Sequence, residues 1–498
     1  MRSQRNAGAG KLRSPAFLRD RACLLRSTLF VVSFFVAAQA LDAKEPDAGV
    51  ARPNIVYLLV DDLGWSDLGC YGSDLHETPN IDRLARNGMR FTDAYAAASV
   101  CTPTRAAIMT GEHPARLHMT IWREGAKNPP RKSKVIPPVT RENLPLEKIT
   151  IAERLKEAGY TTAHIGKWHL GDAFHYPETQ GFDVNIGATH WGCPATFYYP
   201  FRGELYGDYR YVPGLPIGNE GDYLTDRLTD EALKVIDSVK DRPFFLYMAY
   251  YTVHFPIEGK QELVDRYKKE LHPRLRHTNA HYAAMAHSLD ESVGRILARL
   301  KKHGIDDNTI VILTSDNGGF IGKWKEQPVV TNNAPLRSGK GSLYEGGVRV
   351  PLLVRWPGVT KPGSTSREPV VLTDMYRTIL DAAKLKVPAE QLSSDGVSLT
   401  PVLKDPSATL ERDALYWHYP HYYSTTSPVS AVRAGDWKLL EFLEDGRLEL
   451  YNLRDDLGEK VNLAKRLPKR RNELADKLRQ WRKAVDAQMP MQNPDFEQ

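Results

Sequence analysis

The chain has 498 residues, of which 42% are hydrophobic and 26% charged, and a formal net charge of +6. This length allows a large domain and a smaller one, and the composition is that of a globular protein, which excludes a disordered chain. The whole net charge comes from residues 1–40, where Lys and Arg exceed the single Asp20, so the rest is close to neutral. A near-neutral remainder without a basic tract gives no support to nucleic-acid binding.

The first 40 residues have the pattern of a secretory signal. A basic segment precedes the apolar run 29–38, and Ala38-Gln39-Ala40 is a small-x-small cleavage site. The apolar run is shorter than the roughly 20 residues that a membrane-spanning helix needs. We therefore expect a signal peptide over residues 1–40, an exported protein that is periplasmic or secreted, and no stable membrane anchor. An uncleaved anchor is the weaker alternative.

Apolar strands alternate with helices through the next part of the chain. This alternation predicts an α/β fold, a sheet with helices on both faces, over residues 50–405. The expected strands are 54–60, 161–165, 243–251, 309–314 and 348–354, and the expected helices are 78–88, about 149–158 and about 279–303.

From about Leu410 the pattern changes to short strands, which indicate an antiparallel sheet. These strands are expected at 414–419, 430–433, 437–442 and 448–451, and a basic helix follows at about 469–487. We expect a small α+β domain over residues 406–498, packed on the first domain.

Export would leave three cysteines, Cys70, Cys101 and Cys193. An odd number of cysteines is not a disulfide framework. Cys70 and Cys193 could pair or remain buried thiols, and the sequence leaves both possibilities open. If they pair, Cys101 is the thiol that remains.

The stretch 99–111 stands out for its chemistry. Pro103 suits the first turn of a helix and good helix formers follow it, so Cys101 is expected at a helix N-terminus. The free amides and the positive end of the helix dipole favour a negative charge there. Arg105 follows one turn later on the same face, so a reactive group and a fixed cation would share one space. A cysteine taken alone is more often a small buried side chain, and its neighbours must decide.

Polar residues repeatedly follow the apolar strands. Each alone has an ordinary explanation as a turn residue or a buried histidine, but ligands of α/β sheets bind at the carboxyl ends of the strands. The strand-end residues are Asp61, Asp62, Lys167, His169, His254, Asp316 and Asn317, and a glycine-flanked loop adds Lys340. Oxygen ligands suit Ca²⁺ or Mg²⁺ rather than zinc. Several cations around one metal indicate a tetrahedral dianion or an ester monoanion as substrate.

These motifs resemble those of the type I, formylglycine-dependent sulfatases of the alkaline phosphatase superfamily. The resemblance covers most of residues 52–400 and implies a large, mixed but mostly parallel sheet with a smaller C-terminal α+β domain. It rests on Val60-Asp61-Asp62-Leu63-Gly64, Cys101-Thr102-Pro103-Thr104-Arg105, Gly166-Lys167-Trp168-His169-Leu170-Gly171, His254, Ser315-Asp316-Asn317-Gly318 and Gly339-Lys340-Gly341, in family order. Thr104 stands where the family usually has Ser, and because a hydroxyl is kept we still expect modification of Cys101.

The resemblance also implies roles for the site residues. A formylglycine-generating enzyme would oxidise Cys101 before or during export, and the aldehyde hydrate would attack sulfur, release the alcohol and then expel sulfate. Ca²⁺ would be held by Asp61, Asp62, Asp316, Asn317 and modified Cys101, with Asp316 assisting deprotonation of the nucleophile. Arg105 and His169 would support the hydrate, Lys167 and Lys340 would grip the sulfate oxygens, and His254 would help protonate the leaving oxygen.

Two aromatic groups, in the loop 187–223 and at 418–423, suit the apolar faces of a sugar or an aryl group, although packing of long loops explains them equally well. The basic segment 123–134 could attract a polyanionic glycan, with a solvated loop as the default. We therefore expect sulfate-ester hydrolysis, with a sulfated carbohydrate preferred to an aryl sulfate. The alternatives are a phosphodiester or phosphonate monoester hydrolase of the same superfamily and a sulfoglycan-binding protein whose Cys101 stays a thiol.

Overall fold

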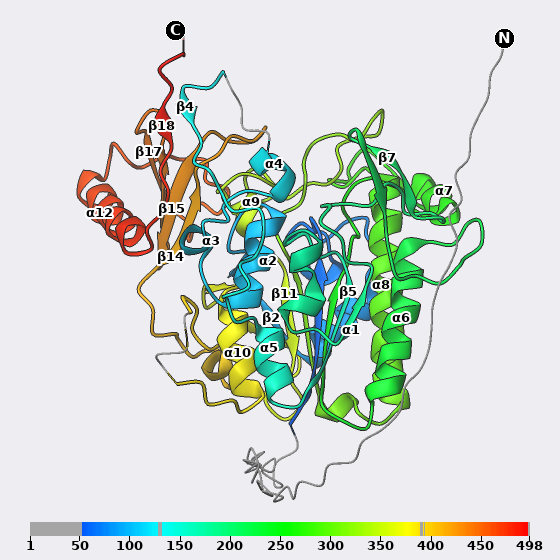
Figure 1. Cartoon of the computed structure of the whole chain (residues 1–498). Helices are drawn as coiled ribbons and strands as arrows, with labels where there is room; N and C mark the ends of the chain where they lie inside the picture. Colours follow the sequence, from blue (N-terminus) through cyan, green and yellow to red (C-terminus); the bar gives the residue numbers. More distant parts are fainter. Residues whose placement is uncertain (1–51, 128–131, 389–391, 393, 497–498) are drawn as a thin grey trace, which may run out of the picture. The chain divides into compact units, whose positions relative to one another are not determined.

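A computed structural model describes residues 52–127, 132–388, 392 and 394–496, so the predicted signal peptide lies outside the described residues. Eight strands form one large sheet in the order β12-β2-β11-β10-β1-β9-β5-β6 (Figure 1). All its neighbouring strands are parallel except that β11 is antiparallel to both β10 and β2, so the predicted mixed, mostly parallel sheet is confirmed. The strands are β1 (Asn54–Val60), β2 (Met89–Phe91), β5 (Thr161–Gly166), β6 (Val184–Ile186), β9 (Phe244–Ala249), β10 (Thr309–Ser315), β11 (Leu352–Arg355) and β12 (Ser364–Ser366).

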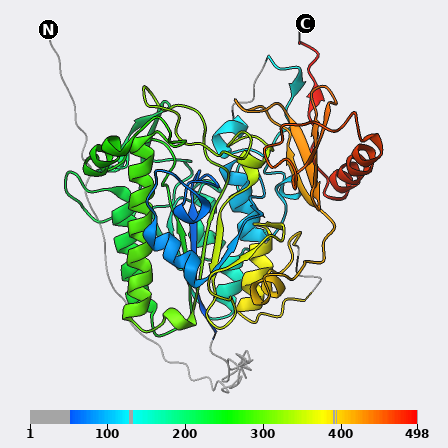
Figure 2. The same cartoon turned by 180° about the vertical axis from the view of Figure 1, so that it is seen from behind.

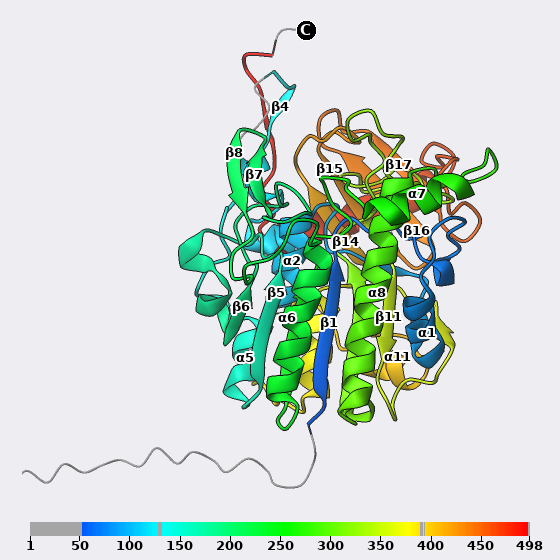
Figure 3. The ribbon, with the colours of Figure 1, turned by 90° about the vertical axis from the view of Figure 1, so that its right-hand side faces the viewer.

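Helices cover both faces of this sheet because its central strands are apolar on both sides. In β1, Tyr57 packs into the core on one face, and Leu58 into the core on the other. The first face is covered by α2 (Cys101–Thr110), α5 (Ile151–Glu157) and α10 (Asp374–Ala382). The second is covered by α1 (Pro79–Asn87), α6 (Leu224–Val239) and α8 (Ala280–Lys302), and Figure 3 shows α6 and α8 in front of the sheet.

A second sheet lies beyond the first and is antiparallel throughout, in the order β14-β15-β16-β17. Its elements are β14 (Leu415–Tyr419), β15 (Val429–Ala434), β16 (Trp437–Phe442), β17 (Leu448–Asn452) and the helix α12 (Pro468–Ala484). One face packs on α12, and the other packs through Trp417 and Tyr419 on the part that holds Val100 (Figures 1 and 2). The smaller antiparallel-sheet domain is therefore confirmed, and its boundary at residues 405–406 stays a prediction.

The predicted strand 348–354 is wrong at its start. The short helix α9 (Glu345–Val348) comes first, and pairing begins only at Leu352. Pro351 has no N–H to donate to a neighbouring strand, and the Gly347 carbonyl instead accepts a hydrogen bond from the Gly318 N–H at 2.9 Å. The chain before Pro351 is thus hydrogen-bonded to the loop that carries Asn317.

The remaining elements are short and lie mostly in the connections. They are β3 (Ala94–Tyr95), α3 (Pro114–Leu117), α4 (Arg123–Lys127), β4 (Val135–Ile136), β7 (Arg202–Leu205), β8 (Asp208–Tyr211), α7 (Gln261–Glu270), β13 (Val370–Val371), α11 (Thr400–Lys404) and β18 (Met491–Gln492), with four 3₁₀ turns at 69–71, 173–175, 177–180 and 306–308. Among the described helices, none is both long and apolar enough to cross a membrane.

The register of the parallel strands brings their carboxyl ends to one edge. Val60 of β1 lies beside Ser315 of β10, and Ala249 of β9 lies beside both Leu59 and Gly166. The residues that follow these strands therefore meet, as ligand-binding residues do in open α/β sheets. The β7–β8 hairpin lies above this edge in Figure 3.

Candidate active site

Cys101 is the first residue of α2 and is only 3% exposed. The Thr104 hydroxyl accepts the Ala98 N–H at 3.0 Å and lies 3.2 Å from the Ala98 carbonyl oxygen, which closes the turn before the helix. The Sγ atom lies 3.3 Å from Nδ1 of His169. Burial alone would raise the pKa of the thiol, but the positive charges of Lys167 and His169 lower the pKa of Cys101 to about 6. The predicted electropositive setting of Cys101 is present.

Four oxygen-bearing side chains at the strand ends, Asp61, Asp62, Asp316 and Asn317, form what we call the strand-end cluster. Lys167 Nζ donates to Asp61 Oδ2 at 2.6 Å. Arg105 donates through Nε to Asp316 Oδ2 at 2.9 Å, and its Nη1 donates to the Lys167 carbonyl at 2.9 Å. Burial beside a second carboxylate raises the pKa of Asp61, whereas Arg105 and Lys167 outweigh burial and lower the pKa of Asp316.

The other half of the strand-end cluster is organised around Asp62, whose backbone has a positive φ of 61°. Lys340 Nζ lies 2.7 Å from Oδ1 of Asp62, and Asn317 Nδ2 donates to the same oxygen at 2.8 Å. His254 Nε2 lies 3.0 Å from Lys340 Nζ and 3.5 Å from Asp62 Oδ2. Burial and the charge of Lys340 lower the pKa of His254, so this imidazole is neutral and accepts a hydrogen bond from the ammonium group.

The strand-end cluster fits a hard divalent cation. Two of its oxygens, Asp61 Oδ1 and Asn317 Oδ1, are buried and have no hydrogen-bond partner among the described residues. Buried oxygens without a partner are costly unless a ligand completes them, and oxygen donors suit Ca²⁺. Donor atoms of Asp61, Asp62 and His254 lie within 4.8 Å of one another. The three carboxylates are balanced by Arg105, Lys167 and Lys340, so a divalent cation would leave the site positive and attractive to an anion.

Glu124 of α4 also belongs to the site, although no sequence pattern predicted it. Its Oε2 lies 2.7 Å from His169 Nε2, and its Oε1 accepts the Gly192 N–H at 2.9 Å. A side chain at Gly192 would place its Cβ 2.6 Å from the His169 ring, so only glycine permits this approach. Burial would lower the pKa of His169, but Glu124 and Cys101 outweigh burial and raise it. No motif marks Glu124, because the contact joins positions far apart in the chain.

A cavity of about 430 Å³ opens above Cys101. It is lined by Cys101, Trp122, Glu124, Gly125, His169, Gly192, Cys193, Tyr206, Asp208, Arg210, His254, Phe255, Lys340 and Tyr423. Each of the two predicted aromatic groups contributes one tyrosine to this wall, Tyr206 and Tyr423. Of the others, Phe197, Phe201 and Tyr419 are buried and pack the core, whereas Tyr209 and Tyr211 are exposed. The second sheet's connections also reach the site, because the Thr425 hydroxyl donates to the Lys340 carbonyl at 2.8 Å.

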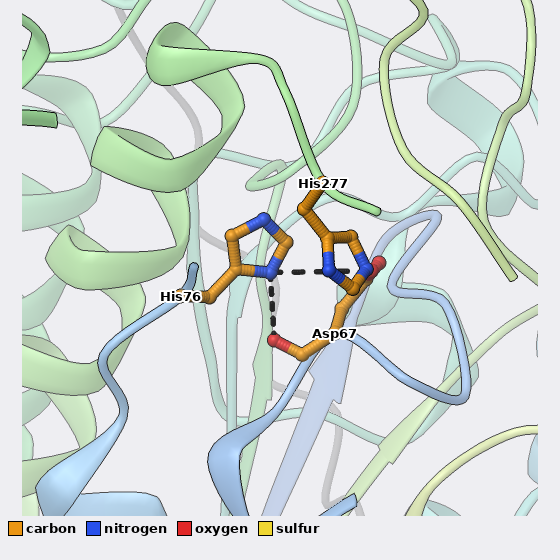
Figure 4. Close-up of side chains that lie close together, drawn as sticks. All are labelled: Asp67, His76 and His277. Carbon is orange, nitrogen blue, oxygen red and sulfur yellow. Dashed lines mark hydrogen bonds and ion pairs between the residues drawn. The ribbon is translucent and has the colours of Figure 1, made fainter. Parts of the chain in front are cut away.

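In a second buried cluster, Asp67, from the loop that also carries Asp61, meets His76 and His277, and Figure 4 shows the three side chains facing one another. We call it the Asp67 network. Asp67 Oδ2 accepts the Gly64 N–H at 2.7 Å and the Tyr282 hydroxyl at 2.6 Å, while Oδ1 lies 3.2 Å from His277 Nε2. Both carboxylate oxygens are therefore occupied, which is the pattern of a structural network rather than of a metal site.

Each histidine of the Asp67 network is held by a hydrogen bond through Nδ1, whereas His277 Nε2 forms only the ion pair with Asp67. His76 Nδ1 donates to the Asp67 carbonyl at 2.9 Å, and His277 Nδ1 donates to Asp74 Oδ1 at 2.6 Å. Burial would lower the pKa of His277, but Asp67 and Asp74 outweigh burial and raise it, so His277 is held as a cation. Burial lowers the pKa of His76 to about 4, which keeps it neutral. The network fixes the chain that follows Asp61 and Asp62.

The structure also shows whether Cys70 and Cys193 form a disulfide bond. Cys70, Cys101 and Cys193 are all free thiols, so Cys70 and Cys193 do not pair. Burial raises the pKa of both Cys70 and Cys193 to about 12, which leaves them as thiols at neutral pH. Of these three, Cys101 is the one whose surroundings favour the anion.

The comparisons with known proteins agree with this geometry. A family model described as Sulfatase matches residues 53–385, and one described as N-sulphoglucosamine sulphohydrolase, C-terminal, matches residues 339–485. The chain is 36% identical to a sulfatase of Formosa agariphila over 86% of this chain and 88% of the relative, and 33% identical to human arylsulfatase A over 83% and 84%. The crystal structure of Ps i-CgsB in complex with k-i-k-neocarrahexaose is similar with a TM-score of 0.74 and 30% identity, covering 90% of this chain and 95% of that one.

An α/β sheet with a buried electropositive cysteine and carboxylates at its carboxyl edge thus defines the class, and the chain belongs to the sulfatase family of the alkaline phosphatase superfamily. It is a sulfatase, an enzyme that hydrolyses sulfate esters. The predicted family and the predicted reaction type are confirmed.

Proposed function

We propose that this sulfatase releases sulfate from a sulfated carbohydrate, using a formylglycine formed from Cys101 and a Ca²⁺ ion in the strand-end cluster. One observation carries the proposal: Cys101 is buried at the start of α2 beside three cation–carboxylate pairs, in a cluster where Asp61 and Asn317 each have an oxygen without a partner among the described residues. A plain buried thiol would need no such surroundings. The predicted roles of the site residues are retained here as parts of this proposal.

The aldehyde hydrate supplies two hydroxyl groups on one carbon, one to attack sulfur and one to let the sulfated product break down, which a serine or cysteine lacks. His169 Nδ1 lies 3.3 Å from Cys101 Sγ and holds a proton at this position because Glu124 raises its pKa. Arg105 orients Asp316 and the Lys167 carbonyl at the same time. These contacts keep the nucleophilic position fixed while the substrate binds.

Asp61, Asp62, Asp316 and Asn317 would hold Ca²⁺, together with modified Cys101, and the bound ion would supply positive charge opposite the sulfate group. Lys167 and Lys340 would bind the sulfate oxygens, since both are buried cations near Cys101 and Lys340 also lines the cavity. Such fixed charges act strongly in a site that excludes water.

Lys340 and His254 provide the proton for the leaving oxygen. In this structure the ammonium group donates to the neutral imidazole across 3.0 Å, so the proton rests on Lys340. This refines the expectation that His254 helps to protonate the leaving oxygen, because the two groups form a donor pair that shares one proton. A sulfate oxygen that takes the place of Asp62 on Lys340 would favour transfer of that proton.

A carbohydrate substrate is supported by the shape and lining of the cavity. Trp122, Phe255 and Tyr423 offer apolar faces beside the cations, and a cavity of about 430 Å³ is of the size that binds a small ligand. The similar structure named above was solved with a neocarrahexaose, a sugar chain. Human arylsulfatase A is also a relative, so an aryl sulfate is the alternative to test.

Three measurements on the exported protein test this proposal. The peptide that contains Cys101 should have the mass expected for an aldehyde at this position. The N-terminus of the exported protein should lie near residue 41 if residues 1–40 are a signal peptide. Sulfate release from sulfated oligosaccharides should exceed release from an aryl sulfate and from phosphodiesters or phosphonate monoesters. A uniformly unmodified thiol would count against the nucleophile, and activity on the aryl ester alone would overturn the carbohydrate preference.

A further inference from the structure

The β7–β8 hairpin places a buried guanidinium group in the wall of the active-site cavity. Arg210 of β8 is only 4% exposed, yet it lines the same cavity as Cys101 and Lys340. It belongs to none of the motifs that carry the sulfatase chemistry. Its presence there therefore requires another explanation.

The hydrogen-bonding capacity of Arg210 is largely unused. Nη1 donates to Cys193 Sγ at 2.9 Å and to the Cys193 carbonyl at 3.4 Å, and a thiol is a weak acceptor. The carboxylate of Asp208 lies 3.7 Å from Nη2, beyond hydrogen-bond distance, and its side chain is 56% exposed. Nε has no partner among the described residues. Arginine keeps its charge at any accessible pH, so this buried cation lacks a full counter-charge.

The surroundings of Arg210 would hold a sugar ring beside it. The Tyr206 ring lies 5.3 Å from the guanidinium carbon, and Tyr206 is exposed and lines the cavity. Tyr423 and Trp122 line the same cavity and pack edge-on, with ring centres 5.4 Å apart. An anion bound at Arg210 would therefore belong to a group on a ring that these aromatic side chains can contact.

We propose that Arg210 binds a second anionic group of the substrate, a carboxylate or a further sulfate, while the scissile sulfate lies over Cys101. The planar fork of arginine matches both anions in a two-pronged contact. The substrate class is then a glycan that carries at least two anionic groups within reach of one cavity. This inference rests on the proposed function, since it assigns a substrate feature to the same site.

Binding to the full-length Cys101→Ala enzyme, which cannot turn over, tests the proposal by titration calorimetry. The probes are pairs that differ by one anionic group: N-acetylglucosamine 6-sulfate against glucosamine 2-N,6-O-disulfate, κ- against ι-neocarrabiose, and N-acetylgalactosamine 6-sulfate against the chondroitin 6-sulfate disaccharide. The first two pairs add a sulfate, and the third adds a carboxylate together with the sugar that carries it. We expect the doubly anionic member of at least one pair to bind about 10-fold more tightly, which corresponds to one charge-assisted contact.

Adding Arg210→Gln should reduce that preference to within about twofold, and Arg210→Lys, which keeps the charge without the fork, should retain part of it. The matched control is Arg202→Gln, which removes a like charge from the exposed side of the same hairpin and should keep the full preference. An effect of overall charge would instead reduce the preference for the doubly anionic probe in both Arg210→Gln and Arg202→Gln.

If no doubly anionic probe binds better than its match, or if Arg210→Gln keeps the preference, the role of Arg210 is overturned. Sulfate release by the aldehyde-bearing wild-type enzyme is measured alongside. Release with equal affinities refutes only the Arg210 inference, whereas the absence of release from every sulfate ester refutes the proposed function as well. Arg210→Lys serves as the decisive variant if Arg210→Gln does not fold.

Discussion

The strand-end cluster and the Asp67 network share the segment that follows β1, which carries Asp61, Asp62 and Asp67, and both are buried. In the strand-end cluster, Asp61 and Asn317 each keep an oxygen without a partner among the described residues. In the Asp67 network, both oxygens of Asp67 are occupied and His277 sits between two carboxylates. Buried oxygens without a hydrogen-bond partner, rather than burial alone, are therefore what separates a ligand site from a structural network here.

The largest expected effect comes from removing Cys101, the proposed nucleophile beside the strand-end cluster. Cys101→Ala should lower kcat for sulfate release by at least about 10⁴-fold, since the covalent route is lost. The control is Cys70→Ala, which removes a thiol outside the cavity and should keep near-wild-type rates. Steady-state kinetics on one sulfated oligosaccharide measure both. A Cys101→Ala enzyme with ordinary activity would mean that the reaction does not pass through this residue.

Substitutions of Asp61 and Asp67 should differ in their effect on the affinity for Ca²⁺. Asp61→Asn should weaken Ca²⁺ binding by roughly 100-fold, because a charged ligand with an unused oxygen is lost. Asp67→Asn should leave the affinity for Ca²⁺ nearly unchanged and should lower the melting temperature. Saturating Ca²⁺ at 100 times Kd stabilises a binding-competent chain by about 2.7 kcal/mol, so thermal unfolding with and without Ca²⁺ reads out both variants. An equal loss of the calcium shift in the two variants would erase the distinction between the clusters.

Glu124 offers an intermediate effect at the edge of the strand-end cluster. Glu124→Gln should lower kcat by roughly 10–100-fold, because His169 loses the charge that orients it. Glu124 raises the pKa of His169. The limb of the pH–rate profile that His169 controls should therefore move toward lower pH in the variant. The control is Glu142→Gln, which removes a nearby, more exposed carboxylate paired with Lys127. An unmoved profile would show that Glu124 only supports the fold.

The smallest expected effect is one of stability in the Asp67 network. The folded pKa of His277 is raised, so its contribution is fully present below the unfolded pKa of about 6.5 and is lost as pH rises through the folded pKa. His277→Gln should therefore cost about 2 kcal/mol at pH 6 and less at pH 9. Chemical denaturation at the two pH values measures this difference.

His303→Gln is the matched control for that measurement. It removes a more exposed histidine paired with Asp237 and should change the free energy of unfolding by less than about 0.5 kcal/mol at either pH. A His277→Gln penalty that grows with pH would contradict the assignment of a charged His277 between two carboxylates.

Most of the fold and the core of the site could be predicted from the sequence because both depend on local patterns. Buried apolar runs gave the central strands, and parallel strands bring Asp61 and Asp316 to the same edge by necessity. The start of β11 could not be predicted, because the residues before Pro351 are held by a distant loop. An apolar run alone does not reveal that competition.

The residues that complete the cavity were out of reach for a related reason. Glu124 and Arg210 act through partners that only the tertiary fold supplies, and each lies in a segment that looks like an ordinary solvated loop or hairpin. Tyr423 lay within a predicted aromatic group, yet nothing local separates it from Tyr419, which is buried in the core. Composition identified the groups, and packing decided which members face the cavity.

The burial of the stretch around Cys101 has a consequence for the order of events in the life of the protein. Thr102 and Thr104 are fully buried, and Cys101 and Arg105 are almost so. A second enzyme cannot read these side chains once α2 is packed, so an aldehyde on Cys101 has to be installed while the chain is still unfolded. Under the proposed mechanism, a molecule that folds before Cys101 is modified keeps its thiol and is inactive. The active fraction of a preparation would therefore equal the fraction of chains that were modified before they folded.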